Sequence, residues 1–232
     1  MSRWGNLPVS PDPYPLSASR TSAARWATFD CYGTLIDWNG GIRGELSRVF
    51  GEDRADALVR RYHVLEKELE TDGTRSYREV LTEAMRGLGA PAGEEDALAR
   101  SLPEWRPFPE VPDALREVRA RGWKLAILSN TDRDFIEASQ EQIGVPFELA
   151  IVASDIGSYK PALGHWQAFE RETGRAPDVH VAASLFHDIA PATELGLTSV
   201  WINRLGEETG PAPTRELPDL APLPEALEEL AA

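Results

Sequence analysis

Four groups of polar residues in this sequence have the types and spacing that covalent chemistry would need. Asp30 follows one short apolar run, Ser129 and Asn130 follow a second, Lys160 follows a third and Asp188 follows a fourth. A carboxylate can act as a nucleophile, a general base or a metal ligand. Hydroxyl and amide groups can bind an anionic substrate, and a lysine beside a carboxylate keeps that carboxylate ionised. Singly, the acids and Ser129-Asn130 fit helix capping and Lys160 fits a surface loop, so only the whole set points to a site.

The apolar runs before these residues are predicted to be strands. They cover residues 25–30, 124–128, 149–152 and 179–183, and a fifth run covers 198–202. Helical stretches are expected between the later strands, at residues 112–120, 134–143, 163–173 and 190–195. Short buried strands that alternate with helices are typical of an α/β protein with a parallel sheet and helices on both faces. Functional groups of such sheets gather at the carboxyl ends of the strands, so we expect the four groups to meet there.

Residues 41–102 interrupt this alternation and are expected to form a helical cap. They contain no convincing strand, and apolar residues recur on one helical face at Leu58, Tyr62, Leu65 and Leu69. The predicted organisation is a core domain of residues 25–40 and 103–232 with an inserted cap of residues 41–102. Residues 1–24 are rich in proline and serine and are expected to be a flexible tail.

Composition narrows the classes of function. Apolar residues make up 42% of the chain, enough for a full hydrophobic core. The formal net charge of −14 disfavours binding to nucleic acid or to an anionic membrane surface, although a local basic pocket can still bind a small anion. Cys31 is the single cysteine, which excludes an intrachain disulfide and fits a cytoplasmic location.

The motifs around these residues resemble those of a known superfamily. They are Phe29–Asp37, Leu128–Asn130, Tyr159–Pro161 and His187-Asp188 followed by Gly196–Arg204. In this order they are similar to the four motifs of the haloacid dehalogenase superfamily, over roughly residues 25–205. The resemblance implies a Rossmann-like core with an inserted helical cap, and a covalent nucleophile at Asp30.

Tyr32 indicates which branch of the superfamily is nearest. Superfamily phosphatases carry a second aspartate at this position, where it protonates the leaving group. A halide leaves without a proton, so a tyrosine there is compatible with dehalogenation and damaging for phosphate ester cleavage. The Asp-x-Tyr-Gly-Thr form resembles the L-2-haloacid dehalogenases. That likeness implies cleavage of a carbon–halogen bond of a short 2-haloacid through an Asp30 ester, with no metal or cofactor.

The resemblance also implies roles for the other residues. Tyr32, Ser129 and Asn130 would contact a small anionic substrate, and Arg61 on an early cap helix would receive the halide, with Arg60 as the alternative. Thr34 would support the nucleophile loop. Lys160 and Asp188 would form an ion pair that holds Asp30 and orients the hydrolytic water.

Three departures from the dehalogenase pattern leave two alternatives open. Ala183 and Leu185 stand where those enzymes usually carry Ser and Asn, and Trp166 replaces a tyrosine. One alternative is a phosphatase in which Asp30 and Asp188 share Mg²⁺. The other is a catalytically quiet relative that binds a metabolite or protein. A homodimer is left open.

Overall fold

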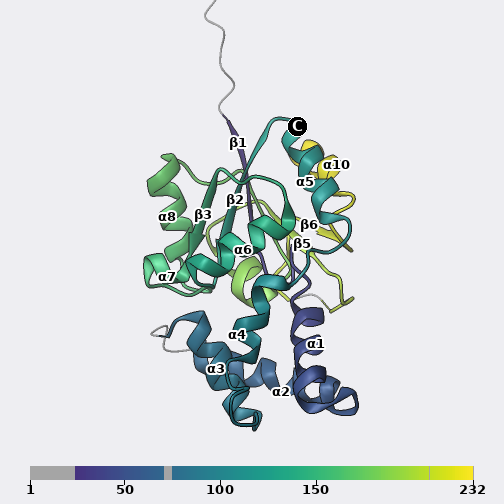
Figure 1. Cartoon of the computed structure of the whole chain (residues 1–232). Coiled ribbons are helices and arrows are strands. Elements are labelled where there is room, and N and C mark those ends of the chain that lie inside the picture. Colours follow the sequence, from purple (N-terminus) through teal and green to yellow (C-terminus); the bar gives the residue numbers. More distant parts are fainter. Residues whose placement is uncertain (1–23, 71–74, 209, 232) are drawn as a thin grey trace, which may run out of the picture.

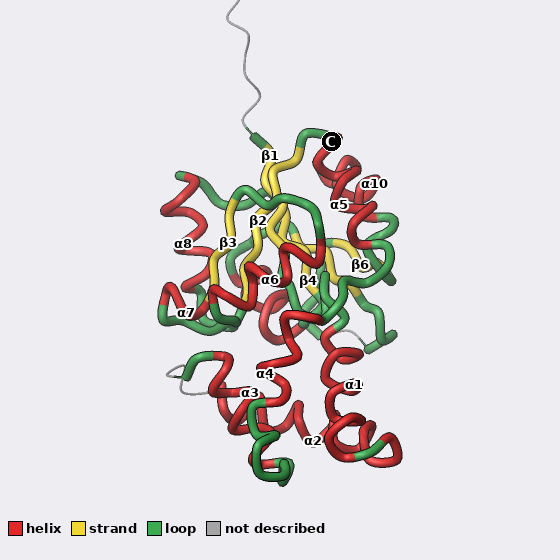
Figure 2. Tube along the Cα trace, in the orientation of Figure 1, coloured by secondary structure: helices red, strands yellow, loops and turns green. Residues whose placement is uncertain are grey.

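A six-stranded parallel sheet forms the centre of the computed structural model, which describes residues 24–70, 75–208 and 210–231. Its strands run in the order β3-β2-β1-β4-β5-β6 and are all parallel. Their bounds are β1 Arg25–Phe29, β2 Trp123–Ser129, β3 Leu149–Val152, β4 Val179–Ala182, β5 Ser199–Ile202 and β6 Arg215–Leu217. The five predicted strands are present, and β6 extends the sheet beyond β5 at one edge (Figure 2).

Helices cover both faces of this sheet. They are α5 Val111–Ala120, α6 Arg133–Ile143, α7 Ala153–Ile156, α8 Gly164–Thr173, the short π-helix η2 Leu185–Ile189, α9 Ala190–Glu194 and α10 Leu223–Leu230. Leu125 and Ile127 of β2 pack in the cluster that contains residues of α5 and α6, whereas Ala126 and Leu128 pack with Trp166 of α8. Successive side chains of a strand point to opposite faces, so the predicted α/β class is confirmed.

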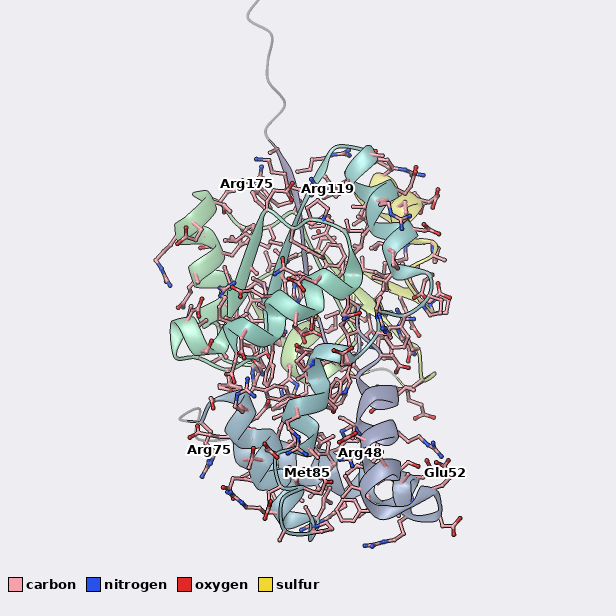
Figure 3. All side chains as sticks on the ribbon, viewed as in Figure 1. Arg48, Glu52, Arg75, Met85, Arg119 and Arg175 are labelled. Atoms are coloured by element: carbon pink, nitrogen blue, oxygen red, sulfur yellow. The ribbon has the colours of Figure 1, made fainter. Side chains whose placement is uncertain are left out.

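A second group of helices lies beyond the carboxyl ends of the strands (Figure 1). It comprises α1 Trp38–Phe50, α2 Glu52–Glu70, α3 Tyr77–Gly87, α4 Ala97–Ser101 and the 3₁₀ turn η1 Leu102–Glu104. Met85 is fully buried inside this group, while Arg48 and Glu52 lie on its outside (Figure 3). The helices of this group span residues 38–104, and on this basis we propose a core and an inserted cap close to the expected bounds, 25–40 with 103–232 for the core and 41–102 for the cap.

Two expectations concern the ends and the surface of the chain. The predicted tail of residues 1–24 falls almost wholly outside the described residues. Among the helices of residues 24–70, 75–208 and 210–231, none has the length and apolarity that a membrane span requires.

Candidate active site

Asp30 lies one residue beyond the end of β1, at the edge of the sheet that faces the helical group. Its backbone N–H donates to Val181 O at 3.0 Å, which ties the start of the loop to β4. The Thr34 hydroxyl donates to Asp30 Oδ2 at 2.8 Å and accepts a hydrogen bond from Ala183 N at 2.9 Å. Gly33, with a φ of 88°, supplies the left-handed turn that lets Thr34 reach back to Asp30. The carboxylate is therefore held by its own loop and by the neighbouring strand.

Lys160 bridges the two acids that the sequence singled out. Its Nζ donates to Asp30 Oδ1 at 2.9 Å, to Asp188 Oδ1 at 2.6 Å and to Leu128 O at 2.8 Å. Burial opposes the charged form, but the charges of Asp188 and Asp30 raise the pKa of Lys160 above its ordinary value. An ammonium group has three hydrogens, and all three are used. Lys160 is thus a fixed cation with no hydrogen left for water.

The pKa values of the two acids move in opposite directions. Burial and the nearby charge of Asp188 raise the pKa of Asp30, against the opposing effects of Lys160 and Thr34. Burial also acts to raise the pKa of Asp188, but the charge of Lys160 and a hydrogen bond from His180 bring it below its ordinary value. Asp188 Oδ2 is buried and has no hydrogen-bond partner among the residues that the structure describes. This oxygen is available to a water molecule or a ligand.

Asn130 lines the cavity and also holds the backbone of Lys160. Its Oδ1 accepts from Lys160 N at 2.7 Å, and its Nδ2 donates to Lys160 O at 3.0 Å. Both ends of the amide therefore hold the backbone of Lys160, which aims the ammonium group at Asp30. The neighbouring Ser129 is almost fully buried and lines the same space.

A cavity of about 470 Å³ opens above these residues, between the sheet edge and the helical group. The core side contributes Asp30, Tyr32, Ser129, Asn130, Lys160, Ser184, Phe186, His187, Asp188 and Glu207. The helical group contributes Trp38, His63, Glu66, Lys67, Glu70 and Tyr77. The Tyr32 hydroxyl is hydrogen-bonded to Ser139 Oγ at 3.0 Å. The four groups singled out in the sequence thus surround one space.

Arg61 does not reach this cavity. Its side chain is exposed, and it is absent from the lining residues. His63, two positions further along α2, does line the cavity, and two positions separate side chains by about 200° around a helix. Arg61 therefore points away from Asp30, contrary to the expectation that it faces the nucleophile. Arg60 lies nearer that face by the same geometry, but it is also exposed and outside the lining.

Two carboxyl groups of α2 line the cavity instead of an arginine. Glu66 Oε1 accepts hydrogen bonds from the Tyr62 and Tyr77 hydroxyls, each at 2.9 Å. Burial raises the pKa of Glu66 to about 7. Burial, together with the charge of Glu66, raises the pKa of Glu70 to about 9. His187 Nε2 is 3.7 Å from Glu70 Oε2, and burial lowers the pKa of this histidine. At neutral pH Glu70 is therefore mostly protonated and Glu66 about half ionised, and the basic Lys67 lines the same side of the cavity.

The sequence matches the family described as haloacid dehalogenase-like hydrolases over residues 24–181. Among curated proteins, it is 31% identical to an (S)-2-haloacid dehalogenase of Pseudomonas sp. (strain YL), over 88% of this chain and 94% of that protein. The chain belongs to the haloacid dehalogenase-like hydrolases. A haloacetate dehalogenase, H-2, of Moraxella sp. (strain B) is 28% identical over 82% of this chain and 92% of its own.

Solved structures of haloacid dehalogenases share the fold. A crystal structure of an L-2-haloacid dehalogenase superposes with a TM-score of 0.78 at 24% identity and covers 89% of this chain and all of that one. The L-2-haloacid dehalogenase of Xanthobacter autotrophicus with chloropropionic acid covalently bound gives a TM-score of 0.77 at 21% identity, over 88% and 98% of the two chains. At these identities the likeness concerns the arrangement of the sheet and cap.

The phosphatase alternative requires that Asp30 and Asp188 share Mg²⁺. Among residues 24–70, 75–208 and 210–231, no group of three or more His, Cys, Asp or Glu side chains is placed to hold a metal ion. The fourth motif supplies Asp188 alone near Asp30, and Oδ1 of each acid is bound to Lys160. The residues present therefore do not form a ready site for Mg²⁺.

Several residues of this haloacid dehalogenase-like hydrolase escaped the sequence analysis. Glu66, Glu70 and His180 were not among the residues expected at the site. The i, i+4 spacing of the two glutamates beside Tyr62 was the available signal for the cap face. For His180, the signal was a histidine inside a predicted buried strand, three positions before the predicted end at residue 183.

Proposed function

We propose that this hydrolase cleaves the carbon–halogen bond of a short 2-haloacid and releases halide and a 2-hydroxy acid. The observation that carries the proposal is the Asp30 carboxylate, which lines a cavity and is held between the Thr34 hydroxyl and the Lys160 ammonium. The family membership and the dehalogenase relatives support it. The small anionic substrate and the cytoplasmic location belong to the same proposal.

The first step is a displacement by Asp30. One carboxylate oxygen forms a bond to the carbon that bears the halogen, and the carbon–halogen bond breaks with its electron pair leaving on the halide. Lys160 supplies positive charge beside the substrate carboxylate, and the Ser129 hydroxyl donates to it. The Tyr32 ring packs against the substrate. Asn130 positions Lys160 through one N–H and the oxygen of its amide, and the second N–H can donate to the substrate.

The departing halide moves toward the cap. In the proposed mechanism, Glu70 and the protonated fraction of Glu66 stabilise it by hydrogen bonding, in place of the arginine first expected. A neutral donor supplies no positive charge to the halide, but it also does not repel the anionic substrate. Preorganised donors of this kind lower the energy of developing charge in a water-poor site.

The second step is hydrolysis of the Asp30 ester. A water molecule bound to Asp188 Oδ2 attacks the Asp30 carboxyl carbon, and the bond from that carbon to the substrate oxygen breaks. Asp188 takes one water proton and passes it to the product oxygen, which completes the hydroxy acid. The second water proton is released when the Asp30 carboxyl group ionises again. Lys160 keeps both acids in place throughout.

A substrate panel with matched variants tests the proposal. We expect halide release from chloroacetate or 2-chloropropionate, unchanged by EDTA or added Mg²⁺, and no release of phosphate from a generic phosphate ester. Asp30→Asn should abolish halide release, while Asp155→Asn, at an exposed acid paired with Arg133, should leave it intact. Phosphate release that requires Mg²⁺ would instead support the phosphatase alternative, and no turnover of any compound would support a binding protein.

A further inference from the structure

A second cavity, of about 430 Å³, adjoins the one above Asp30. The two share Tyr32, Trp38, Ser184, Phe186 and Glu207 in their linings. A volume in this range is typical of sites for small organic molecules, which run from roughly 300 to 1,000 Å³. The shared residues make the second cavity an extension of the first.

The lining of the second cavity is mostly apolar. It includes two of the positions at which this sequence departs from the dehalogenase pattern. Ala183 and Leu185, which replace the usual Ser and Asn, both line it, together with Phe108, Ile202 and Leu205. Leu205 is 71% exposed, an unusual fraction for a leucine beside a cavity. Apolar surface of this kind gains free energy when an apolar group covers it.

This cavity starts close to the nucleophile. The chain of hydrogen bonds from Asp30 Oδ2 to Thr34 Oγ1 to Ala183 N has two steps, of 2.8 and 2.9 Å. Because the cavity above Asp30 and the second cavity also share Tyr32 and Ser184 in their linings, a carbon attacked by Asp30 can carry a substituent that enters the second cavity. Two buried polar atoms without partners among the described residues, Asn39 Oδ1 and Arg204 Nε, belong to residues that line it. These two atoms are available to hydrogen-bond a polar group at the end of that substituent.

We propose that the second cavity binds an apolar chain on carbon 2 of the substrate, so that the enzyme favours 2-haloacids with longer chains over the shortest ones. This inference rests on the proposed dehalogenation. Full burial of each added methylene group raises kcat/KM by about fourfold. Leu185 and Leu205 set the limit on the chain, because their side chains border the space.

The test measures kcat/KM for 2-bromopropionate, 2-bromobutanoate and 2-bromohexanoate. We expect kcat/KM to rise along the series for the wild type, and Leu185→Trp and Leu205→Trp to lower it for 2-bromohexanoate while sparing 2-bromopropionate. Leu195→Trp, at an exposed leucine away from the cavity, is the matched control. A flat or falling series with active 2-bromopropionate overturns the inference alone, whereas inactivity toward all three acids overturns the proposed function as well.

His180 carries a second inference, from a different observation. This histidine is fully buried in β4, and its Nε2 lies 3.0 Å from Asp188 Oδ1. Its Nδ1 lies 2.9 Å from Thr28 Oγ1, so both ring nitrogens have partners. Because the ionised Asp188 can only accept, His180 Nε2 carries the hydrogen of this bond. Asp188 Oδ1 thus has two donors, His180 and Lys160, and Oδ2 has none.

We infer that His180 is a positioning residue for hydrolysis of the Asp30 ester. By holding Oδ1, it fixes the rotation of the Asp188 carboxylate and turns Oδ2 toward the water that attacks the ester. Ala183 and Leu185 have no side-chain groups that could bind this water. The orientation of Asp188 is therefore more important for positioning the attacking water here than in enzymes with Ser and Asn at those positions.

The two chemical steps separate this role from a merely structural one. In rapid-quench experiments, His180→Leu should release the first equivalent of halide at the wild-type rate and then accumulate the ester on the peptide that contains Asp30. Loss of a hydrogen-bond partner behind an active-site ligand typically costs about 10- to 100-fold, and we expect that loss in ester hydrolysis. His180→Gln, whose amide can still donate, should recover part of the rate.

The control is His165→Leu, which removes another buried histidine that contacts Ser129 O rather than Asp188. It should leave the ratio of the two rates unchanged. Ester hydrolysis at the wild-type rate in His180→Leu, or an equal loss in both steps, would overturn the inference. Failure of the wild type to release halide would overturn the proposed function and this inference together.

Discussion

At the scale of single residues, the face of α2 that meets the substrate is the main correction to the sequence analysis. Arg61 was expected in the cavity, yet Glu66 and Glu70 occupy its cap side. The helix itself was predictable from its periodicity. Its rotation was not, because it depends on how Tyr62 and its apolar neighbours pack within the cap, and a shift of one residue turns a side chain by about 100°.

Arginine variants should reflect that rotation. Arg61→Ala should change kcat/KM for 2-chloropropionate by less than about twofold, since an exposed side chain away from the cavity contributes little. Arg60→Ala is the matched control on the neighbouring position. A loss of about 10²–10³ in Arg61→Ala, the range for removing one charge-stabilising donor, would show that the arginine enters the site during the reaction.

The raised pKa values of the cap carboxyls predict a pH dependence. Both acids gain negative charge as pH rises, Glu66 near 7 and Glu70 near 9, so they repel an anionic substrate progressively in alkaline solution. The kcat/KM for 2-chloropropionate should fall by roughly tenfold per ionised carboxyl, at an effective dielectric constant of about 20. Glu66→Gln and Glu70→Gln should each remove the fall near their own pKa.

Measurement of kcat/KM from pH 6 to about 10, near the titration range of these groups, checks this. Glu68→Gln, an exposed acid on the same helix, should retain the wild-type profile. His187, which faces Glu70, and Lys160 also titrate or carry charge near the site. A wild-type profile that is flat above pH 7 would contradict the account of a proton-bearing cap.

The clustering of the candidate site residues was predictable from the sequence for a simple reason. Asp30, Ser129, Lys160 and Asp188 each lie at or after the end of a strand of one parallel sheet, and the carboxyl ends of such strands meet at one edge. Local sequence thus places them together without any knowledge of distant contacts. Asn130 was found by the same logic, but its task of holding the Lys160 backbone depends on loop geometry that the strand pattern does not specify.

At the scale of elements, one side chain of the core fastens a helix of the cap. Asp132, in the loop after β2, accepts from Tyr77 N and Arg78 N of α3, both at 2.9 Å. These amides are among those left unpaired at a helix start, and a carboxylate there also interacts favourably with the helix dipole. This contact joins the core, which carries Asp30, to Tyr77, the residue whose hydroxyl donates to Glu66.

Removal of this contact should loosen the cap. Asp132→Ala should lower the free energy of unfolding by about 1–2 kcal/mol, the usual cost of losing a helix cap, as measured by urea denaturation. Asp134→Ala, at a nearby exposed acid that pairs with Arg78, should cost less than about 0.5 kcal/mol. Equal stability of the two variants would contradict the role given to Asp132.

Among the elements, β6 shows where sequence patterns fail. Its three residues, Arg215–Leu217, include two charged side chains and lie in a proline-rich stretch. Period-2 patterns need several residues to be recognised, so an edge strand this short carries no signal. The longer central strands are nearly continuous apolar runs, as strands buried on both faces must be, and these were predictable.

At the scale of the whole molecule, the net charge of −14 and an anionic substrate coexist because the site is locally balanced. Lys160 offsets one of the two negative charges of Asp30 and Asp188, and the helical group adds the basic Lys67. At neutral pH Glu70 is largely protonated and Glu66 is about half ionised, so the acids of the helical group add little negative charge. Neither the core nor the helical group alone encloses the cavity.

The central claim is that Asp30 becomes covalently bound to the substrate, and an isotope experiment tests it most directly. With enzyme in excess over 2-chloropropionate, a single turnover is run in H₂¹⁸O. Water attacks the Asp30 carboxyl carbon in this account, so the product should carry unlabelled oxygen from Asp30. The label should appear on the enzyme peptide that contains Asp30. A labelled product with an unlabelled peptide would mean that water attacks the substrate directly, with Asp188 or His187 as the base, and would contradict the covalent route.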